Sequence, residues 1–133
     1  MLDCLIIGDS IAVGTQMYSK ECVAVAKGGI NSWQFNKNYQ GEFFSNIVII
    51  SLGSNDHIGV RTKSELEKLR ARVVAKTTVY WILPANKEHI RDIVKEVAAS
   101  NNDVVIPIRY LQPDKVHPSG RGYKDIVEQI NGN

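Results

Sequence analysis

The sequence predicts an α/β fold in three layers, with helices on both faces of a five-stranded parallel sheet. Two observations support this prediction. Five short apolar runs alternate with stretches of helical periodicity along the chain. These runs are continuously apolar, as strands are when both faces of their sheet are covered. With 133 residues and no linker-like stretch, the chain is expected to form a single domain spanning residues 1–133.

The first half of the chain contains three of the expected strands. Residues 2–7 form an apolar run that ends at a Gly-Asp-Ser turn, and residues 11–18 then show the pattern of a short helix. A second strand is expected over residues 22–26, ahead of a pair of glycines. Residues 32–39 are aromatic and rich in Asn, which makes them a poor helix candidate. The strongest strand pattern covers residues 46–52, which contain four consecutive β-branched residues.

The second half continues the alternation. Thr62 and Glu65 have the spacing of a capping box and predict the start of a helix. The apolar face of that helix would carry Leu66, Leu69, Val73 and Val74. Residues 78–83 are expected as the fourth strand, and residues 103–106 as a fifth at an edge of the sheet, because a proline follows them. Between these strands, Asn86 is expected to cap a helix. A C-terminal amphipathic helix would carry Tyr123, Ile126, Val127 and Ile130.

Composition and charge are those of an ordinary globular protein and exclude several classes of partner. Hydrophobic residues make up 44% of the chain and charged residues 23%. The 16 basic and 14 acidic residues are too balanced for nucleic acid or an anionic membrane to be the main partner. The N-terminal apolar run is too short for a membrane span or a signal peptide, so a cytoplasmic location is expected. No pair of His or carboxylate residues recurs at the spacing of metal ligands, so we expect no metal and no cofactor.

The two cysteines, Cys4 and Cys22, are too few for a disulfide framework. Cys4 sits within the first apolar run, and Cys22 opens the second without a nearby metal-binding partner. Both are therefore expected to be free thiols that pack as small apolar side chains.

Four short polar segments follow predicted strands or lie in the last loop. They are Gly8-Asp9-Ser10, Gly28-Gly29, Gly53-Ser54-Asn55-Asp56 and Asp114-Lys115-Val116-His117. In open α/β sheets, ligands bind in the crevice at the carboxyl ends of the strands. We therefore expect these segments to gather at one edge of the sheet, although they span most of the sequence.

Ser10, His117 and Asp114 have the chemistry of a nucleophile, a general base and a carboxylate that orients the base. Ser10 is expected at the start of a helix, where its own backbone N–H is unpaired and can bind an anion. Each segment alone also has a plain structural explanation. Asp9 or Ser10 can simply cap the helix, and residues 114–117 can be an ordinary surface loop.

The two remaining segments could supply further hydrogen-bond donors to an oxyanion. A glycine of the Gly28-Gly29 pair offers a backbone N–H without a side chain in the way, although such pairs also mark ordinary turns. The side-chain amide of Asn55 is a neutral donor suited to developing negative charge, although it also fits an Asx turn. His57 follows this turn and can reach substrate, whereas His89 lies on a predicted helix and is expected to be solvated.

The chain resembles the SGNH hydrolase superfamily, also called GDSL esterases and lipases. The first block of that family, Gly-Asp-Ser with a Gly four residues after the Ser, stands at residues 8–14. Its third block, Gly-x-Asn-Asp, stands at residues 53–56, and its fifth, Asp-x-x-His-Pro followed by Gly-Tyr, at residues 114–123. The resemblance covers nearly the whole chain and implies the flavodoxin-like fold of the family.

The resemblance implies Ser10 as the nucleophile, with Asp114 and His117 as its partners. It also implies an oxyanion hole formed by the Ser10 N–H, the N–H of a second-block glycine and the Asn55 side chain. The second block departs from the family pattern, which often has an Asn ahead of the oxyanion glycine. The candidates for the second donor are, in order of preference, Gly29, Gly28 and Ser32.

The chain is short for this family and has no segment long enough for a lid, so we expect an open, shallow site. Such a site disfavours long acyl chains. We therefore expect an esterase for short acyl groups, above all acetyl, on a small-molecule or carbohydrate alcohol, since the family includes many sugar deacetylases. Trp33 and Tyr110 are candidates for stacking on a sugar, whereas Trp81 fits the core better. The alternatives are a short-chain thioesterase or lysophospholipase, and a binding module that kept the fold without catalysis.

Overall fold

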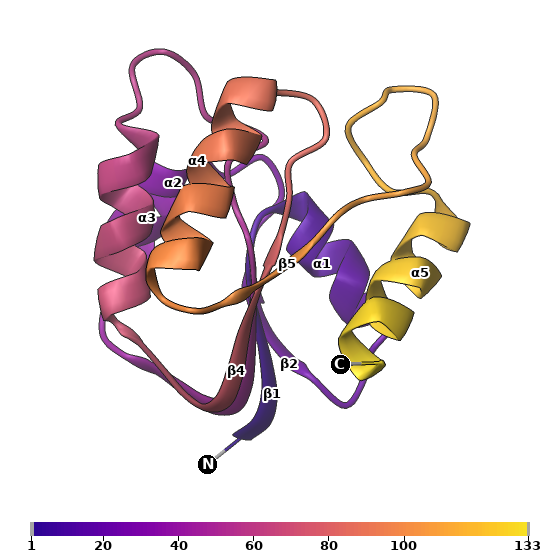
Figure 1. The fold of residues 1–133 in the computed structure, drawn as a ribbon, viewed down its shortest axis with the longest axis horizontal. Coiled ribbons are helices and arrows are strands. Elements are labelled where there is room, and N and C mark those ends of the chain that lie inside the picture. The colour runs from indigo at the N-terminus through magenta and orange to yellow at the C-terminus, as the bar shows by residue number, and fades with distance from the viewer. Residues whose placement is uncertain (1, 133) are drawn as a thin grey trace.

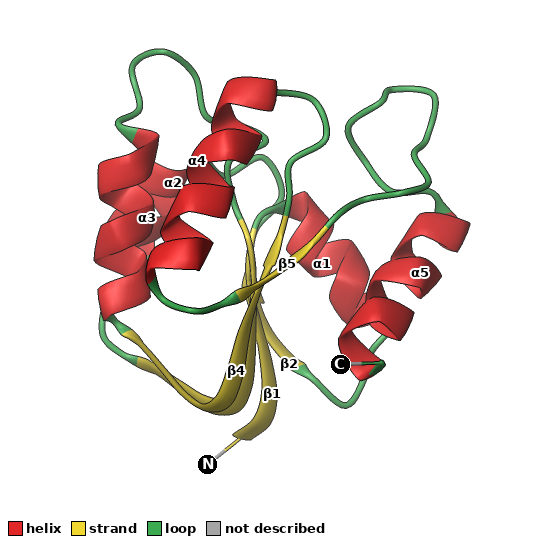
Figure 2. Cartoon of the chain, viewed as in Figure 1, coloured by secondary structure: helices red, strands yellow, loops and turns green. Residues whose placement is uncertain are grey.

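The structure is a computed structural model that describes residues 2–132. The strands are β1 (Leu2–Gly8), β2 (Val23–Ala26), β3 (Phe43–Ser51), β4 (Val73–Ile82) and β5 (Val104–Ile106). The helices are α1 (Ser10–Met17), α2 (Ser32–Asn38), α3 (Thr62–Ala71), α4 (Glu88–Ser100) and α5 (Gly120–Asn131). Strand and helix alternate throughout this part of the chain, as predicted (Figure 2). None of the five described helices is long and apolar enough to cross a membrane.

The five strands form one parallel sheet in the order β2-β1-β3-β4-β5. Helices α2, α3 and α4 cover one face of this sheet, and α1 and α5 cover the other (Figure 1). The short strand β5 lies at an edge, as predicted from the proline after it. The predicted three-layer α/β fold with a five-stranded parallel sheet is confirmed.

Neighbouring residues of the central strands enter two different cores. In β1, Ile7 packs under α2, α3 and α4, whereas Ile6 packs under α1 and α5. Ile50 and Ile49 of β3 divide in the same way, and all four side chains are buried. This two-sided burial is the physical reason why the strands are continuously apolar in the sequence.

Two helix starts differ from the sequence prediction. The segment expected to be a poor helix forms α2, because Asn31 and Gln34 make a capping box at its start. The capping box predicted from Thr62 and Glu65 is absent. The Thr62 hydroxyl instead donates a hydrogen bond to the buried carboxylate of Asp56, which no local pattern could indicate.

Strand β4 begins earlier than predicted, and α4 lacks its predicted cap. The two valines that start β4 at Val73 were expected on a helix face, but they pair with the two phenylalanines that open β3. Cross-strand pairs of β-branched and aromatic residues stabilise this extension. At α4, the N-cap position is Lys87, and Asn86 donates to the carbonyl of Ser54 instead.

Cys4 and Cys22 form a disulfide, which corrects the prediction of two free thiols. The cause is the register of two neighbouring strands. Leu5 of β1 pairs with Val23 of β2, so the residues immediately before them also face one another. Their Cα atoms are 4.6 Å apart, within the range that a disulfide bridges. The pairing depends on the register between β1 and β2, which the local sequence does not contain.

Candidate active site

The predicted site segments meet at the carboxyl edge of the sheet, which is the upper edge in Figure 1. Ser10 begins α1 directly after β1, and Gly28 follows β2. Gly28 lies close to Ser10, since a β-carbon added to this glycine would be 3.8 Å from the Cβ atom of Ser10. Asn55 follows β3, and His117 lies in the long loop between β5 and α5.

His117 connects Ser10 to Asp114 by two hydrogen bonds. Its Nε2 atom lies 2.8 Å from Oγ of Ser10, and its Nδ1 atom lies 2.7 Å from Oδ2 of Asp114. An ionised carboxylate can only accept a hydrogen bond, so Nδ1 carries the proton. The Nε2 lone pair then faces the Ser10 hydroxyl, which is the arrangement a general base needs.

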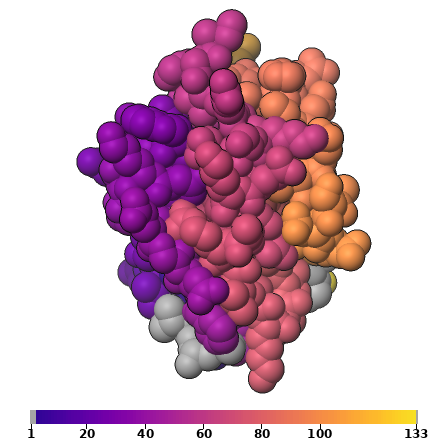
Figure 3. Space-filling model, turned by 90° about the vertical axis from the view of Figure 1, so that its left-hand side faces the viewer, coloured from indigo at the N-terminus to yellow at the C-terminus, as the bar shows by residue number. Residues whose placement is uncertain are grey.

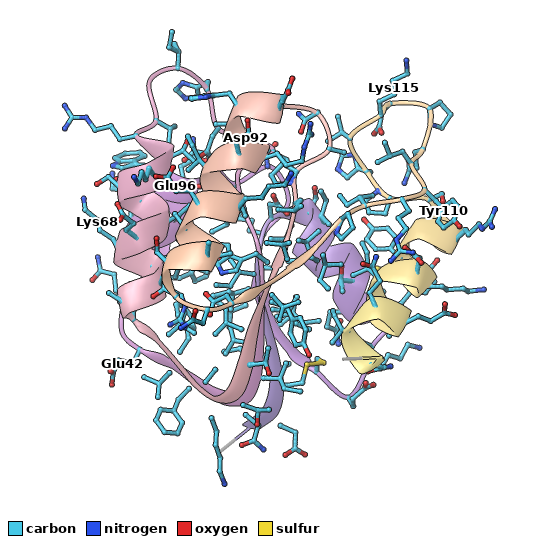
Figure 4. All side chains as sticks on the ribbon, viewed as in Figure 1. Glu42, Lys68, Asp92, Glu96, Tyr110 and Lys115 are labelled. Atoms are coloured by element: carbon cyan, nitrogen blue, oxygen red, sulfur yellow. A yellow bond between two sulfur atoms is a disulfide. The ribbon has the colours of Figure 1, made fainter. Side chains whose placement is uncertain are left out.

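Asp114 is held ionised by the loop that contains it. Its Oδ1 atom accepts hydrogen bonds from the backbone N–H groups of Val116, at 2.9 Å, and His117, at 3.0 Å. The Val116 N–H and then the His117 side chain lower the pKa of Asp114 from 3.8 to about 2. Lys115, at the tip of this loop in Figure 4, adopts a left-handed conformation with φ 60°. The side chains of His117 and Asp114 are 36% and 45% exposed, so the pair lies at an open surface.

Asp9 caps α1, which is the plain structural role considered for this segment. Its Oδ1 atom accepts hydrogen bonds from the Ile11 N–H and the Ser51 hydroxyl, both at 3.0 Å. Its Oδ2 atom is buried and has no hydrogen-bond partner within residues 2–132. Burial raises the pKa of this carboxyl from 3.8 to about 6. Because Asp9 performs the capping, the Ser10 hydroxyl remains available to His117.

Three backbone N–H groups near Ser10 were candidates for binding an oxyanion. The amides of Gly28 and Gly29 have no acceptor in the described part of the chain. The Ser32 amide, the third candidate, donates to Oδ1 of Asp56 at 2.8 Å and is therefore occupied. The Ser10 amide stands at the first position of α1, where helix geometry provides no acceptor.

Asn55 lies against the turn that contains these glycines. Its side-chain amide donates a hydrogen bond to the Ile30 carbonyl at 3.0 Å, which leaves the second amide hydrogen for another acceptor. Asp56 is a positioning residue, a role that its place at the end of the Gly53-Ser54-Asn55-Asp56 segment did not indicate from the sequence. Its carboxylate joins the start of α2, through the Ser32 N–H, to the start of α3, through Thr62.

Solved structures of other proteins resemble this chain, although no sequence comparison gave a match. No protein-family model matches the chain, and no curated protein matches it either. A GDSL-like lipase from Bacteroides thetaiotaomicron superposes with a TM-score of 0.63 at 18% identity, over 98% of this chain and 86% of that chain. A member of the lipolytic protein G-D-S-L family from Veillonella parvula gives 0.62 at 16% identity, over 99% and 97%. This chain has the SGNH hydrolase fold.

The catalytic domain of peptidoglycan O-acetyltransferase A from Streptococcus pneumoniae has the same SGNH fold. It superposes with a TM-score of 0.62 at 17% identity, over 98% of this chain and 90% of that chain. The fold is therefore shared by proteins described as lipases and by an acetyltransferase. At these identities, the likeness establishes the fold and leaves the reaction to be argued from the site.

Two motif residues of the SGNH resemblance serve packing in this structure. A β-carbon on Gly14 would clash with the ring of Tyr123, so α1 and α5 approach closely because residue 14 is a glycine. A β-carbon on Gly122 would clash with the backbone oxygen of Tyr110. That close contact seats the loop between β5 and α5, which carries His117, on the start of α5.

The two residues predicted to bind substrate, Trp33 and His57, are brought together by the SGNH fold. They line one hollow of about 580 Å³ beside Asn31, and Trp33 is 48% exposed. Neither Ser10 nor His117 lines that hollow. The hollow therefore does not contain the Ser10–His117 pair.

The other two aromatic candidates lie in different environments. Trp81 is fully buried and donates to the carboxylate of Asp103 at 2.9 Å, so it belongs to the core. Tyr110 lies at the base of the loop in Figure 4, with the Arg121 guanidinium 4.0 Å from its ring centroid. His89 is exposed, as predicted for a solvated side chain. Residues 2–132 contain no group of three His, Cys, Asp or Glu side chains that could hold a metal ion.

Proposed function

We propose that this chain is a serine esterase that hydrolyses short-chain carboxylic esters, with O-acetyl groups on carbohydrates as its substrates. The observation that carries the proposal is the unbroken hydrogen-bonded line from Ser10 through His117 to Asp114. A binding module would not need a serine hydroxyl aligned with an imidazole in this tautomer. The lipases and the acetyltransferase that share the fold support acyl chemistry at such a site.

In the proposed mechanism, Oγ of Ser10 attacks the carbonyl carbon of the ester while Nε2 of His117 takes the hydroxyl proton. Asp114 stabilises the resulting imidazolium. The tetrahedral intermediate then collapses, His117 gives its proton to the departing alcohol, and an acyl group remains on Ser10. A water molecule attacks this acyl-enzyme with His117 again acting as the base, which releases the carboxylic acid and restores the serine.

The oxyanion of each intermediate would be bound by three donors. We assign these to the backbone N–H of Ser10, the backbone N–H of Gly29 and the second amide hydrogen of Asn55. Gly28 remains the alternative to Gly29, because its amide has no acceptor among residues 2–132 and it lies close to Ser10. Ser32 is not assigned as a donor to the oxyanion, because its N–H already donates a hydrogen bond to Asp56.

The preference for a short acyl group rests on the exposure of the site. His117 and Asp114 are more than a third exposed, and neither Ser10 nor His117 lines the hollows around Trp33 and His57. A growing acyl chain would find little apolar surface to bury, although each buried methylene can contribute up to ~0.8 kcal/mol. The specificity constant should therefore be highest for acetyl or propionyl esters.

The deciding experiment tests the nucleophile. A fluorophosphonate should label Ser10 of the wild-type protein, and Ser10→Ala should remove both the label and nearly all hydrolysis of p-nitrophenyl acetate. Circular dichroism should show that the variant keeps its fold. Labelling of a different serine would refute the assignment. Absence of both labelling and hydrolysis in the wild type would support a non-catalytic binding module.

An acyl-length series then tests the substrate class. Nitrophenyl esters from acetyl to octanoyl should show kcat/KM declining by hexanoyl, and acetylated sugars should release acetate. A rise in kcat/KM through octanoyl would favour the thioesterase or lysophospholipase alternative. Adding unacetylated sugar as an acceptor would distinguish transfer from hydrolysis, since only transfer conserves the acetyl ester.

A further inference from the structure

The walls of the hollow that contains Trp33 and His57 follow, along the chain, the turns that carry the proposed oxyanion donors. The hollow lies between α2 and the segment that leads into α3, which face the viewer side by side in Figure 3. Asn31, on its wall, follows the residue whose carbonyl holds the Asn55 amide. His57 stands two residues after Asn55 on the other wall. A substrate with its ester at Ser10 could therefore extend past Asn55 into this hollow.

An aromatic ring and a hydrogen-bond donor line the hollow. Trp33 is 48% exposed, and the Lys37 ammonium lies 4.8 Å from its ring centroid. Such a ring offers an apolar face against which the C–H groups of a sugar can pack. The Nδ1 atom of His57 accepts a hydrogen bond from the Gly59 N–H, so Nε2 carries the proton and can donate to a sugar oxygen.

The hollow is lined by two cationic side chains, Arg61 and Lys68, and by one carboxylate, Glu65, so one positive charge is left without a partner among residues 2–132. Arg61 is exposed, and its guanidinium has no hydrogen-bond or ion-pair partner among residues 2–132. Within the described part of the chain, Lys68, on the outer side of α3 in Figure 4, pairs with Glu65 alone, at 3.7 Å. That carboxylate is buried and also accepts from Asn36.

We propose that this hollow binds an acidic sugar residue next to the ester, with the guanidinium of Arg61 bound to the carboxylate of that sugar. An unpaired guanidinium matches a carboxylate with two parallel N–H bonds, which an ammonium or an amide cannot reproduce. Trp33 packs against the sugar ring, and His57 binds a hydroxyl group. Resting on the proposed esterase function, this assigns the substrate class as O-acylated acidic saccharides.

Binding is tested without catalysis, so failure of this proposal is distinct from failure of the esterase proposal. The Ser10→Ala protein is titrated with a short unacetylated oligogalacturonate and with a neutral galactose oligomer of equal length, by calorimetry and tryptophan fluorescence. The acidic oligomer should bind and change the Trp33 emission, and its affinity should fall with added salt. The neutral oligomer should bind at least about tenfold more weakly.

Two charge-removing variants separate the site from general electrostatics. Arg61→Gln should weaken oligogalacturonate binding by at least about tenfold, because it leaves the carboxylate without its bidentate partner. Lys95→Gln removes the same charge from an exposed position on α4 outside the hollow and should leave binding unchanged. Equal affinity for the two oligomers, equal effects of the two variants, or no binding of the acidic oligomer would each overturn the proposal.

Discussion

At the residue scale, Asp114 uses its two carboxylate oxygens for two different purposes. One oxygen accepts two backbone N–H groups and so fixes the turn, and the other accepts the imidazole N–H of His117. The pKa of about 2 means that this carboxylate stays ionised throughout the neutral and moderately acidic range. Any loss of activity on mild acidification should therefore come from groups other than Asp114.

Asp114→Asn should lower kcat for p-nitrophenyl acetate by roughly a thousandfold or more. An amide can donate to Nδ1, which favours the wrong imidazole tautomer and leaves no base for Ser10. Steady-state kinetics and a thermal melt of both proteins check this, with Asp125→Asn on α5 as a matched control of equal chemistry. A variant within tenfold of wild type would mean that Ser10 and His117 act as a dyad.

Asp9 has a pKa well above the ordinary value for an aspartate. It is fully buried next to Ser10, and burial holds its pKa at about 6, above the ordinary 3.8. Between these two pH values the folded protein keeps a proton that the unfolded chain has lost. Stability should therefore fall as the pH rises through this range, by up to about 3 kcal/mol from this group.

Asp9→Asn should remove this part of the pH dependence, because the amide cannot ionise. Its Oδ1 atom can still accept from Ile11 and Ser51, so the cap on α1 should persist. Urea unfolding at about pH 4 and about pH 7 checks the prediction. The variant should gain stability relative to wild type at the higher pH only. Parallel pH curves for the two proteins would contradict it.

At the scale of elements, the approach of α1 to α5 depends on Gly14 facing Tyr123. Gly14→Ala should destabilise the protein by about 1–3 kcal/mol, because the added methyl group has no space. Combining it with Tyr123→Leu should cost less than the sum of the two single changes. Thermal or urea unfolding of the four proteins gives this coupling. Simple additivity would mean that the helices separate freely and that the contact is unimportant.

Elements were predictable from the sequence where one local pattern decides them, as in β1 and β3, whose apolar runs are buried on both faces. They were not predictable where a distant contact decides them. The Thr62 hydroxyl donates to the buried carboxylate of Asp56 and therefore does not cap α3. The two valines after α3 form the start of β4, because they pair with residues of β3. The strand register that joins Cys4 to Cys22 is information of the same distant kind.

The site was predictable in part for the same reason. Short sequence motifs contain the residues proposed for catalysis and indicate their chemical roles: Ser10, Asn55, Asp114 and His117. The topology of a parallel sheet places such segments at the carboxyl edge of the sheet. The occupied amide of Ser32 and the open hollow beside Arg61 depend on how loops pack against each other. No local sequence pattern carries that packing.

At the scale of the whole molecule, the disulfide ties the first strand of the sheet to its edge strand β2. The bridged residues are 18 positions apart, and closing a loop of this size restricts the unfolded chain. The double variant Cys4→Ala/Cys22→Ala should therefore lose about 2–4 kcal/mol of unfolding free energy. The proposed ester hydrolysis should remain at room temperature, because Cys4 and Cys22 lie toward the amino ends of β1 and β2, whereas Ser10 and Gly28 follow their carboxyl ends.

Urea unfolding with and without dithiothreitol checks this prediction. The reductant should destabilise the wild type by a similar amount and leave the double variant unchanged. If the wild type were indifferent to reductant, the bridge would contribute nothing to stability, and the two strands would be held by their backbone pairing alone.

The same bridge makes the chain between Cys4 and Cys22 a closed covalent ring that contains Ser10. Lys20 is exposed on this ring, in the turn before β2, where trypsin can reach it. A single cut there would leave a short N-terminal peptide tethered to the remainder through sulfur. On a gel without reductant the nicked protein would migrate as one molecule. With reductant, a fluorophosphonate label on Ser10 would leave with the short peptide, so one digest would report the nucleophile and the oxidation state together.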